Sequence, residues 1–422
     1  MPSHNFSTPF SRPVYVMLKP AGAHCNLACK YCYYLEKGDL CNSPSPSFQE
    51  ARGMSFAHEA KGFMDENLLE QFTKEYIEMQ TVPQVLFTWH GGEPLLLPIS
   101  FYEKALSLQH KYGRGRQIDN VIQTNGTLLT DEWCEFLKAN HFLVGISIDG
   151  PQECHDYYRS NKQGDGTWQK VMHGIKLLKK HGVEWNGMAV VNAYNVKHPL
   201  EFYHFFKEIG CQYLQFAPIV ERQYDLDGRK HLAHAFEDKA VSLTEESITP
   251  EEWGDFLCTL FDEWVRHDVG KYYVEIFDCI LANWVGEPPG ICIFGKECAN
   301  VGVMERNGDL YSCDHFVFPS YKLGNIKENS LISMFYGEKQ RRFATLKSSR
   351  LPQQCKECKY LFACHGECPK NRFIHDRYGN PGLNYLCKGY YHFLEHVAPY
   401  MEWMKDEYLA GRAPANIMNV LQ

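Results

Sequence analysis

Three closely spaced cysteines near the N-terminus constrain this chain more than any other feature. Cys25, Cys29 and Cys32 have the spacing C-x3-C-x2-C and directly follow an apolar run at Val14–Leu18. Thiolates bind iron–sulfur clusters, and a 4Fe–4S cube takes four ligands. Three protein thiolates would therefore leave one iron open for another molecule. A zinc site or packed free thiols is the alternative interpretation of this spacing.

A second group of cysteines lies in the C-terminal part of the chain. Its eight members are Cys292, Cys298, Cys313, Cys355, Cys358, Cys364, Cys368 and Cys387. Eight thiolates are enough for two fully ligated 4Fe–4S clusters, and two zinc ions would use the same number. Two zinc sites leave the upstream three-cysteine motif unexplained. The remaining cysteines fit no ligand spacing, and we predict that they are buried free thiols: Cys41, Cys134, Cys154, Cys211, Cys258 and Cys279.

The cellular compartment also bears on the cysteines. The N-terminal stretch MPSHNFSTPFSRP lacks the basic and apolar regions of a secretory signal, and no run approaches 18 apolar residues. We therefore expect a cytoplasmic protein with no membrane span. In that reducing compartment, 17 cysteines favour metal binding or redox chemistry over disulfides. The net charge of −8 argues against a nucleic-acid or anionic-membrane partner.

Apolar runs and helical patterns alternate from Val14 to Pro218. The predicted strands are Val14–Leu18, Val85–Trp89, Asn120–Thr124, Val144–Ile148, Met188–Val191 and Tyr213–Pro218. The predicted helices between them are Asp65–Gln80, Phe101–Tyr112, Asp131–Asn140, Trp168–His181 and Pro199–Ile209. This alternation indicates βαβ units and a parallel sheet. Six strands favour an α/β fold, a partial (β/α)6 TIM-like barrel, with its chemistry at the carboxyl ends of the strands.

The rest of the chain divides by composition. We expect the barrel to occupy residues 1–230, with loops at Leu35–Phe63 and Gln223–Thr249. A helical linker over 231–290 would contain a helix at Glu251–Asp268, and a cysteine-rich domain would span 291–390. That domain lacks the apolar pattern of a large core, as expected where metals hold a small fold together. Residues 391–422 would form a C-terminal helix and tail.

The segment from Cys25 to Cys32, with the aromatic Tyr31 before the last cysteine, resembles the signature of the radical S-adenosylmethionine (SAM) superfamily. The resemblance implies that SAM binds the open iron of a 4Fe–4S cluster. Reduction would then yield methionine and a 5′-deoxyadenosyl radical that abstracts hydrogen from a substrate. The radical chemistry would belong to the cofactor, and the protein would supply position and exclusion of water.

Three later segments resemble the SAM-binding motifs of that superfamily. They are Gly91-Gly92-Glu93-Pro94, Gln123-Thr124-Asn125-Gly126, and Ser147 with Arg159. The resemblance implies that the glycines and Glu93 meet the SAM amino group and that the Asn125 segment meets the ribose. Ser147 and Arg159 would bind the carboxylate, for which the paired donors of Arg are suited. The alternative for Arg159 is a solvated surface residue.

The C-terminal cysteine spacing resembles the SPASM domain, in the form found in anaerobic sulfatase-maturating enzymes. The resemblance covers nearly the whole chain and implies three 4Fe–4S clusters with SAM as cosubstrate. By that similarity the first auxiliary cluster has the ligands Cys292, Cys298, Cys313 and Cys368. The second has Cys355, Cys358, Cys364 and Cys387.

The same resemblance implies a reaction and its partners. Such enzymes oxidise a Cys or Ser in the C/S-x-P-x-R motif of a sulfatase to Cα-formylglycine, with ferredoxin or flavodoxin as the electron donor. Asp314 would be the catalytic base, and we expect an adjacent anionic cluster to raise its pKa. Tyr34 would contact substrate. His90 stands where some members have Gln, so no role transfers to it.

Other functions remain open at this point. Another SPASM enzyme that forms a thioether or a carbon–carbon crosslink is the nearest alternative. Those enzymes often carry an N-terminal peptide-recognition domain, for which the stretch before Val14 is short. A non-catalytic electron-transfer protein would account for the eight C-terminal cysteines but not for the open three-cysteine motif. Metal analysis would separate a zinc-stabilised binding module from all of these.

Overall fold

The computed structural model describes residues 13–35, 62–226, 229–233, 241–298 and 300–421. These residues form two compact units. The first comprises the described parts of 1–146, 160–184 and 300–343, and the second those of 147–159, 185–299 and 344–422. Because the units are interleaved along the chain, the linear domain boundaries expected from composition stay a prediction.

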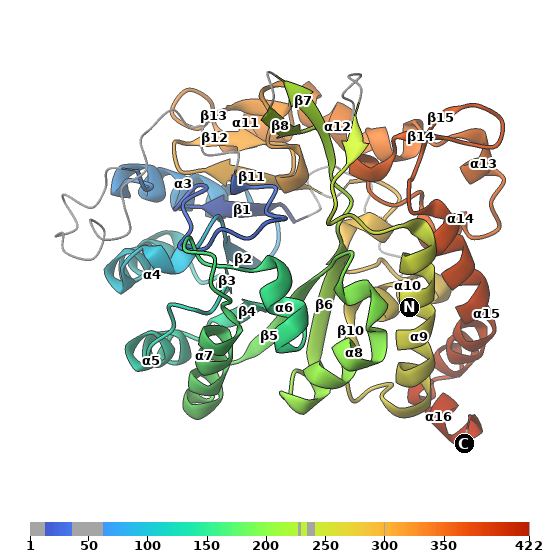
Figure 1. The fold of residues 1–422 in the computed structure, drawn as a ribbon. Helices are drawn as coiled ribbons and strands as arrows, with labels where there is room; N and C mark the ends of the chain where they lie inside the picture. Colours follow the sequence, from blue (N-terminus) through green and yellow to red (C-terminus); the bar gives the residue numbers. More distant parts are fainter. Residues whose placement is uncertain (1–12, 36–61, 227–228, 234–240, 299, 422) are drawn as a thin grey trace. The chain divides into compact units, whose positions relative to one another are not determined.

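A mainly parallel sheet forms the centre of the first unit (Figure 1). Its strands are β1 (Tyr15–Lys19), β2 (Gln84–Trp89), β3 (Gln117–Thr124), β4 (Leu143–Ser147), β11 (Val301–Glu305), β12 (Asp309–Tyr311) and β13 (Lys322–Asn325). Their order is β4-β3-β2-β1-β11-β12-β13. β1 pairs with β2 and β11 in parallel, whereas β11–β12 and β12–β13 are antiparallel. The register places Lys19 opposite Glu305, so both lie at the carboxyl ends of their strands.

Helices cover this sheet because each presents one apolar face. They are α3 (Glu66–Met79), α4 (Ile99–Gly113), α5 (Asp131–Ala139), α7 (Trp168–His181) and α11 (Leu331–Phe335). The Asp65 side chain caps α3 by accepting from the Leu68 amide. Phe72 and Tyr76 of α3 pack on Phe87 of β2, and all three are buried. Burial of each large side chain contributes about 1.5–3 kcal/mol.

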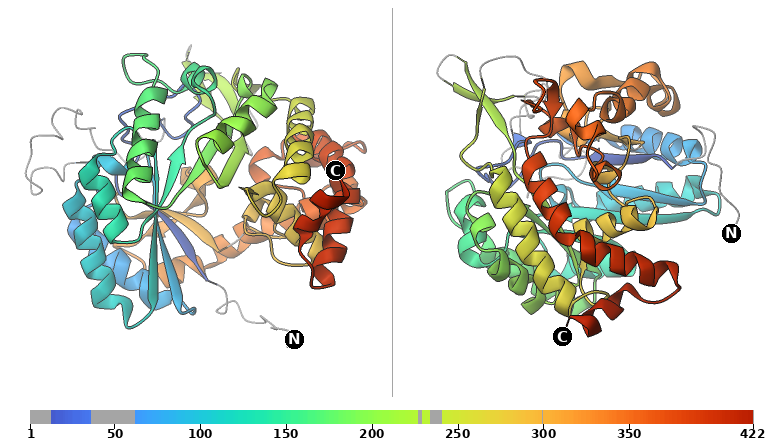
Figure 2. Two further views of the ribbon diagram at one scale, coloured as in Figure 1. Left: turned by 90° about the horizontal axis from the view of Figure 1, so that it is seen from below. Right: turned by 90° about the vertical axis from the view of Figure 1, so that its right-hand side faces the viewer.

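The second unit contains a smaller set of parallel strands. They are β5 (Trp185–Val191), β6 (Tyr213–Pro218) and β10 (Tyr273–Val274), in the order β5-β6-β10. Its longer helices are α6 (Gln152–Tyr158), α8 (Pro199–Glu208), α9 (Pro250–His267), α10 (Glu275–Val285) and α15 (Cys387–Leu409). Figure 2 shows α9 and α15 side by side. A Cβ on Gly389 would lie 2.0 Å from the Pro250 carbonyl oxygen, so this contact requires glycine.

The remaining elements of the C-terminal part are α12 (Glu338–Ser349), which begins in the first unit, α13 (Gln353–Lys356), α14 (Leu361–Cys364), β14 (Ile374–His375), β15 (Pro381–Leu383) and α16 (Ile417–Val420). Within the described ranges, no helix is long and apolar enough to cross a membrane.

The six predicted strands and the predicted helices are confirmed to within a few residues. The loop expected at Gln223–Thr249 is wrong in part, since β7 (Arg222–Leu226), β8 (Arg229–Leu232) and β9 (Ser242–Leu243) form a three-stranded antiparallel sheet. These short strands carry mostly polar residues, so apolar periodicity does not reveal them. The loop expected at Leu35–Phe63 falls almost wholly outside the described residues.

Candidate active site

The three-cysteine loop follows β1 directly. Cys25, Cys29 and Cys32 are all half-buried. Burial raises the pKa of Cys25 to about 12, and the nearby charges of Glu93, Cys29 and Cys32 add to the increase. The Leu27 amide donates to Cys25 Sγ at 3.4 Å. The three sulfurs are thus electrostatic neighbours, and amide hydrogen bonds to sulfur are typical of cluster thiolates.

No three His, Cys, Asp or Glu side chains within the described part of the chain are arranged as a metal-binding group. The cluster ligands therefore stay a prediction. Two observations fit an iron–sulfur cluster: the donors are all thiols, and Cys25 already accepts a backbone amide. Tyr31, the aromatic residue of the predicted motif, is half-buried in the same loop.

The Gly-Gly-Glu segment after β2 lies directly against the chain that leads into Cys25. The Gly92 amide donates to the Gly22 carbonyl at 2.7 Å, and the Glu93 amide donates to the His24 carbonyl at 2.8 Å. A Cβ on Gly92 would lie 2.1 Å from the His24 carbonyl oxygen. Gly91 has a φ of +124°, which side chains disfavour. The two glycines are thus explained by a contact between loops.

Glu93 joins the ends of β2 and β3. Its buried carboxylate accepts from the Leu95 amide at 2.9 Å, Thr124 Oγ1 at 2.7 Å and the Asn125 amide at 2.8 Å. Burial raises the pKa of Glu93 to about 7, against the opposing effect of these bonds. In this structure Glu93 therefore holds the segments after β2 and β3 together through hydrogen bonds.

Asn125 extends this network to the cysteine loop. Its Nδ2 donates to Asn26 Oδ1 at 2.8 Å and lies 3.8 Å from Cys25 Sγ. Its Oδ1 accepts from Thr127, through the amide at 3.0 Å and Oγ1 at 2.7 Å. The sequence-predicted Glu93 and Asn125 are therefore brought together with Cys25.

Asp314 lies in a polar cluster that sequence reasoning did not predict. It begins the 3₁₀ helix η6 (Asp314–Phe316), and its Oδ1 forms an ion pair with Lys19 at the end of β1. Tyr33 Oη donates to the Asp314 Oδ2. The Lys19 Nζ also lies 3.3 Å from the centroid of the Tyr34 ring. Tyr34 Oη donates to both carboxylate oxygens of Glu305, at 2.5 and 2.6 Å.

The raised pKa expected for Asp314 depends on an adjacent cluster and stays a prediction. Burial favours the neutral acid, but the Lys19 ammonium, with His90 and His315, holds the pKa of Asp314 well below its ordinary value. Burial lowers the pKa of His90 to about 4. His90 Nδ1 accepts from the Gly91 amide at 2.8 Å, which places the proton of the neutral ring on Nε2. His90 therefore lies close enough to Asp314 for the charges of the two side chains to interact.

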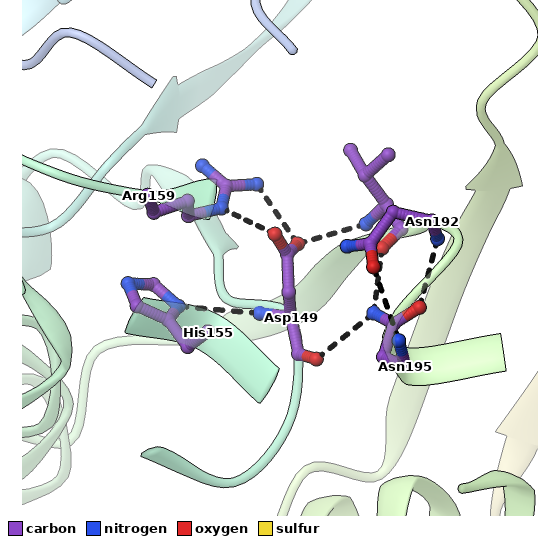
Figure 3. Close-up of polar contacts among 6 residues, drawn as sticks. Asp149, His155, Arg159, Asn192 and Asn195 are labelled. Atoms are coloured by element: carbon purple, nitrogen blue, oxygen red, sulfur yellow. Dashed lines mark hydrogen bonds and ion pairs between the residues drawn. The ribbon is translucent and has the colours of Figure 1, made fainter. Parts of the chain in front are cut away.

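In the second unit, Arg159 is held by Asp149 (Figure 3). Arg159 Nε donates to Asp149 Oδ2 at 2.8 Å, and Nη2 donates to Oδ1 at 3.0 Å. The Val190 amide also donates to Asp149 Oδ1, at 2.9 Å. The alternative of a solvated surface residue is wrong, because the Arg159 side chain is only 9% exposed. Ser147 is half-buried at the end of β4.

The C-terminal cysteines of the second unit form two electrostatic groups. The Lys347 side chain is fully buried, and its Nζ donates to the Cys292 carbonyl at 2.7 Å. Burial lowers the pKa of Lys347, and Cys368, Cys298 and Cys292 oppose that shift. These three thiols therefore lie close enough to Lys347 to influence its charge.

The second group lies around Cys364 and Cys387. Burial raises the pKa of Cys364 to about 12, with further contributions from Cys387 and Cys355. Burial likewise raises the pKa of Cys387 to about 12, with contributions from Cys355 and Cys358. The pairing of these cysteines into two cluster sites stays a prediction. Cys313 belongs to the first unit, so its place in a cluster stays a prediction.

The cysteines left without a role behave as predicted where they are described. Cys134, Cys154, Cys211, Cys258 and Cys279 are buried free thiols. Cys41 lies outside the described residues.

Comparisons with known proteins identify the family of this chain. Residues 20–206 match the radical SAM superfamily, and residues 292–359 match the SPASM iron–sulfur cluster-binding domain. The chain is therefore a radical SAM enzyme with a SPASM domain, and its fold is the partial barrel typical of that class.

Individual relatives identify the family within this class. A serine-type anaerobic sulfatase-maturating enzyme of Bacteroides thetaiotaomicron is 60% identical over 98% of this chain and 96% of its own length. A cysteine-type enzyme of Clostridium perfringens is 32% identical over 92% of this chain and 97% of its own. The structure of native anSMEcpe with bound AdoMet and the Cp18Cys peptide has a TM-score of 0.78 at 30% identity, covering 94% of this chain and 100% of that one. The chain belongs to the anaerobic sulfatase-maturating enzymes.

Proposed function

We propose that this enzyme oxidises a serine, in preference to a cysteine, within the C/S-x-P-x-R motif of a sulfatase. The observation that carries the preference is the 60% identity to one serine-type enzyme, since more distant serine-type and cysteine-type enzymes are both 32% identical. The product would be Cα-formylglycine in either case. Thioether or crosslink formation is the less favoured alternative, because relatives that cover more than 90% of this chain are sulfatase-maturating enzymes.

The proposed cofactors are three 4Fe–4S clusters, with SAM as cosubstrate. Cys25, Cys29 and Cys32 would hold the cluster that binds SAM, and bound SAM would supply the 5′-deoxyadenosyl radical. The auxiliary clusters would have the two ligand sets predicted from the sequence. The coupling of Cys292, Cys298 and Cys368 through Lys347, and of the other four thiols with one another, supports that division. The proposed SAM contacts are Tyr31, Gly91, Gly92, Glu93, Asn125, Ser147 and Arg159.

One task in the oxidation, removal of the substrate proton, falls to a residue of this chain. Conversion of the serine CH₂OH to an aldehyde removes one hydrogen atom, one proton and one electron. We assign the proton to Asp314, whose carboxylate Lys19 and Tyr33 hold in place. A general base must lie within hydrogen-bond reach of the proton it removes. Tyr34 remains a proposed substrate contact, although its hydroxyl donates to Glu305.

The partners of the enzyme follow from the same proposal. The substrate would be a sulfatase polypeptide, and the electron donor a ferredoxin or flavodoxin. A cytoplasmic location, expected from the sequence, stays a prediction.

Two matched peptides test the proposed preference. They would carry one sulfatase sequence that differs only in Ser or Cys at the target position. Anaerobic incubation with reconstituted enzyme, SAM and reductant should convert the Ser peptide with a kcat/KM at least about tenfold higher, a difference of about 1.4 kcal/mol. Mass spectrometry identifies the aldehyde. Exclusive conversion of the Cys peptide would contradict the serine preference, and conversion of neither would contradict the function.

A further inference from the structure

Lys19 is buried at the last position of β1, in the first unit. Its side chain is only 1% exposed. A buried ammonium is costly unless it is paired, so a lysine here requires partners that compensate its charge. The fold supplies them from distant parts of the sequence, because β1 pairs with β11, and η6 follows the antiparallel pair β11–β12.

The partners of Lys19 surround its ammonium with negative charge. Asp314 forms the ion pair, the Tyr34 ring face lies 3.3 Å from Nζ, and Glu305 lies opposite Lys19 in the strand register. Tyr34 in turn is fixed by its hydrogen bonds to Glu305. The ammonium is therefore held from two sides, which leaves it little freedom to follow Asp314 if that carboxylate moves.

Asp314 is the more exposed member of the ion pair. It stands at the start of a short 3₁₀ helix, and its side chain is 17% exposed. Its two oxygens differ: Lys19 contacts Oδ1, and Tyr33 donates to Oδ2. Oδ1 is thus bound to an ammonium, whereas Oδ2 accepts from a neutral hydroxyl, which a substrate hydroxyl could replace.

We propose that Lys19 is the positioning residue of Asp314, and that it turns Oδ2 toward the substrate hydroxyl. This inference rests on the proposed function, in which Asp314 accepts the serine proton. In the step, the substrate O–H bond breaks, the proton passes to Oδ2, and the electron pair stays on the substrate oxygen. The hydrogen atom would leave to the radical that bound SAM supplies, and the electron would pass to an iron–sulfur acceptor. Lys19 forms no bond to the substrate.

Two variants of the reconstituted holoenzyme test this role. Lys19→Met keeps the length of the side chain and removes the charge, whereas Lys19→Arg keeps the charge. In Lys19→Met, iron content and 5′-deoxyadenosine formation should stay near wild type, while formylglycine formed per 5′-deoxyadenosine falls by about 10²-fold, as expected for a misplaced catalytic group. The loss should appear in kcat more than in KM. Lys19→Arg should recover the ratio to within about tenfold of wild type.

A double variant and a surface control separate positioning from packing. Lys19→Met should add no further loss to Asp314→Asn, because both act through one carboxylate. Lys74→Met, on the exposed face of α3, should leave every measurement unchanged. If formylglycine and 5′-deoxyadenosine fall together in Lys19→Met, Lys19 only supports the fold and the inference is overturned.

A crystal structure of Lys19→Met gives a readout that does not depend on activity. Asp314 should adopt a different side-chain orientation or lose its bond from Tyr33. An unchanged Asp314 would overturn the inference even if the proposed function holds. Failure of the wild-type enzyme to convert either peptide would instead overturn the proposed function.

Discussion

Two buried ion pairs, one in each unit, differ in how firmly the chain holds the acid. Asp149 accepts two bonds from Arg159 and one from the Val190 amide, and its side chain is fully buried. Asp314 has a point-charge partner in Lys19, one hydroxyl donor in Tyr33, and 17% exposure. Bidentate Arg–carboxylate pairs fix geometry, whereas an ammonium permits rotation about its stem. Asp149 is therefore an acid that supports the fold, whereas Asp314 is an acid that can exchange hydrogen-bond partners.

The strongest effect on stability should come from removing Asp149. Asp149→Ala leaves the buried Arg159 charge and the Val190 amide without their acceptor. Breaking a buried pair in this way costs about 3–5 kcal/mol. Chemical denaturation of the cluster-free protein should therefore show a large loss in the free energy of unfolding. A loss below about 1 kcal/mol would show that this pair is no firmer than an exposed one.

The pH dependence of stability should show a contribution from His155, whose ring accepts a hydrogen bond from the Asp149 amide at 3.3 Å. Burial, with the Arg159 charge, lowers the pKa of His155 from 6.5 to about 4. The unfolded chain therefore binds this proton at higher pH than the folded chain does. Stability should be fully present above pH 6.5 and fall by about 3 kcal/mol as the pH drops to about 4.

The control for that prediction is His155→Asn, which keeps an acceptor near the Asp149 amide but does not titrate. The difference in unfolding free energy between wild type and this variant should shrink as the pH falls from 6.5 to about 4. A constant difference across that range would show that His155 does not contribute to the acid sensitivity.

Arg159→Lys should give the smallest effect of the series. Lysine keeps the charge but cannot form both bonds to Asp149, so about 1 kcal/mol of stability should be lost. Because Arg159 is also a proposed SAM contact, SAM should bind about tenfold more weakly in an equilibrium titration. Unchanged SAM affinity with reduced stability would leave Arg159 a purely structural residue.

Local patterns account for most of the fold. Strands β1 to β6 are short apolar runs separated by amphipathic helices, so their positions follow from periodicity. Glu93 and Asn125 lie just after the ends of β2 and β3, whereas Arg159 follows α6, twelve residues after the end of β4. The sheet β7–β9 escaped prediction because its strands are short and polar.

The pairing of Lys19 with Asp314 could not be found in the same way. The two residues are 295 positions apart, and they meet only because β11 pairs with β1. Nothing in the local pattern around Lys19 signals that partner. A lysine at the carboxyl end of an apolar strand was nevertheless a visible anomaly, since such an end is buried in a parallel sheet.

The role of Asp314 as the base is tested most directly by the ratio of formylglycine to 5′-deoxyadenosine that Asp314→Asn produces. Asparagine keeps the size of the side chain but cannot accept the proton as a carboxylate does. With intact clusters and continued SAM cleavage, the ratio should fall by about 10²–10⁴-fold, as expected for the loss of a general base. A ratio near that of the wild type, with the same iron content, would contradict Asp314 as the base.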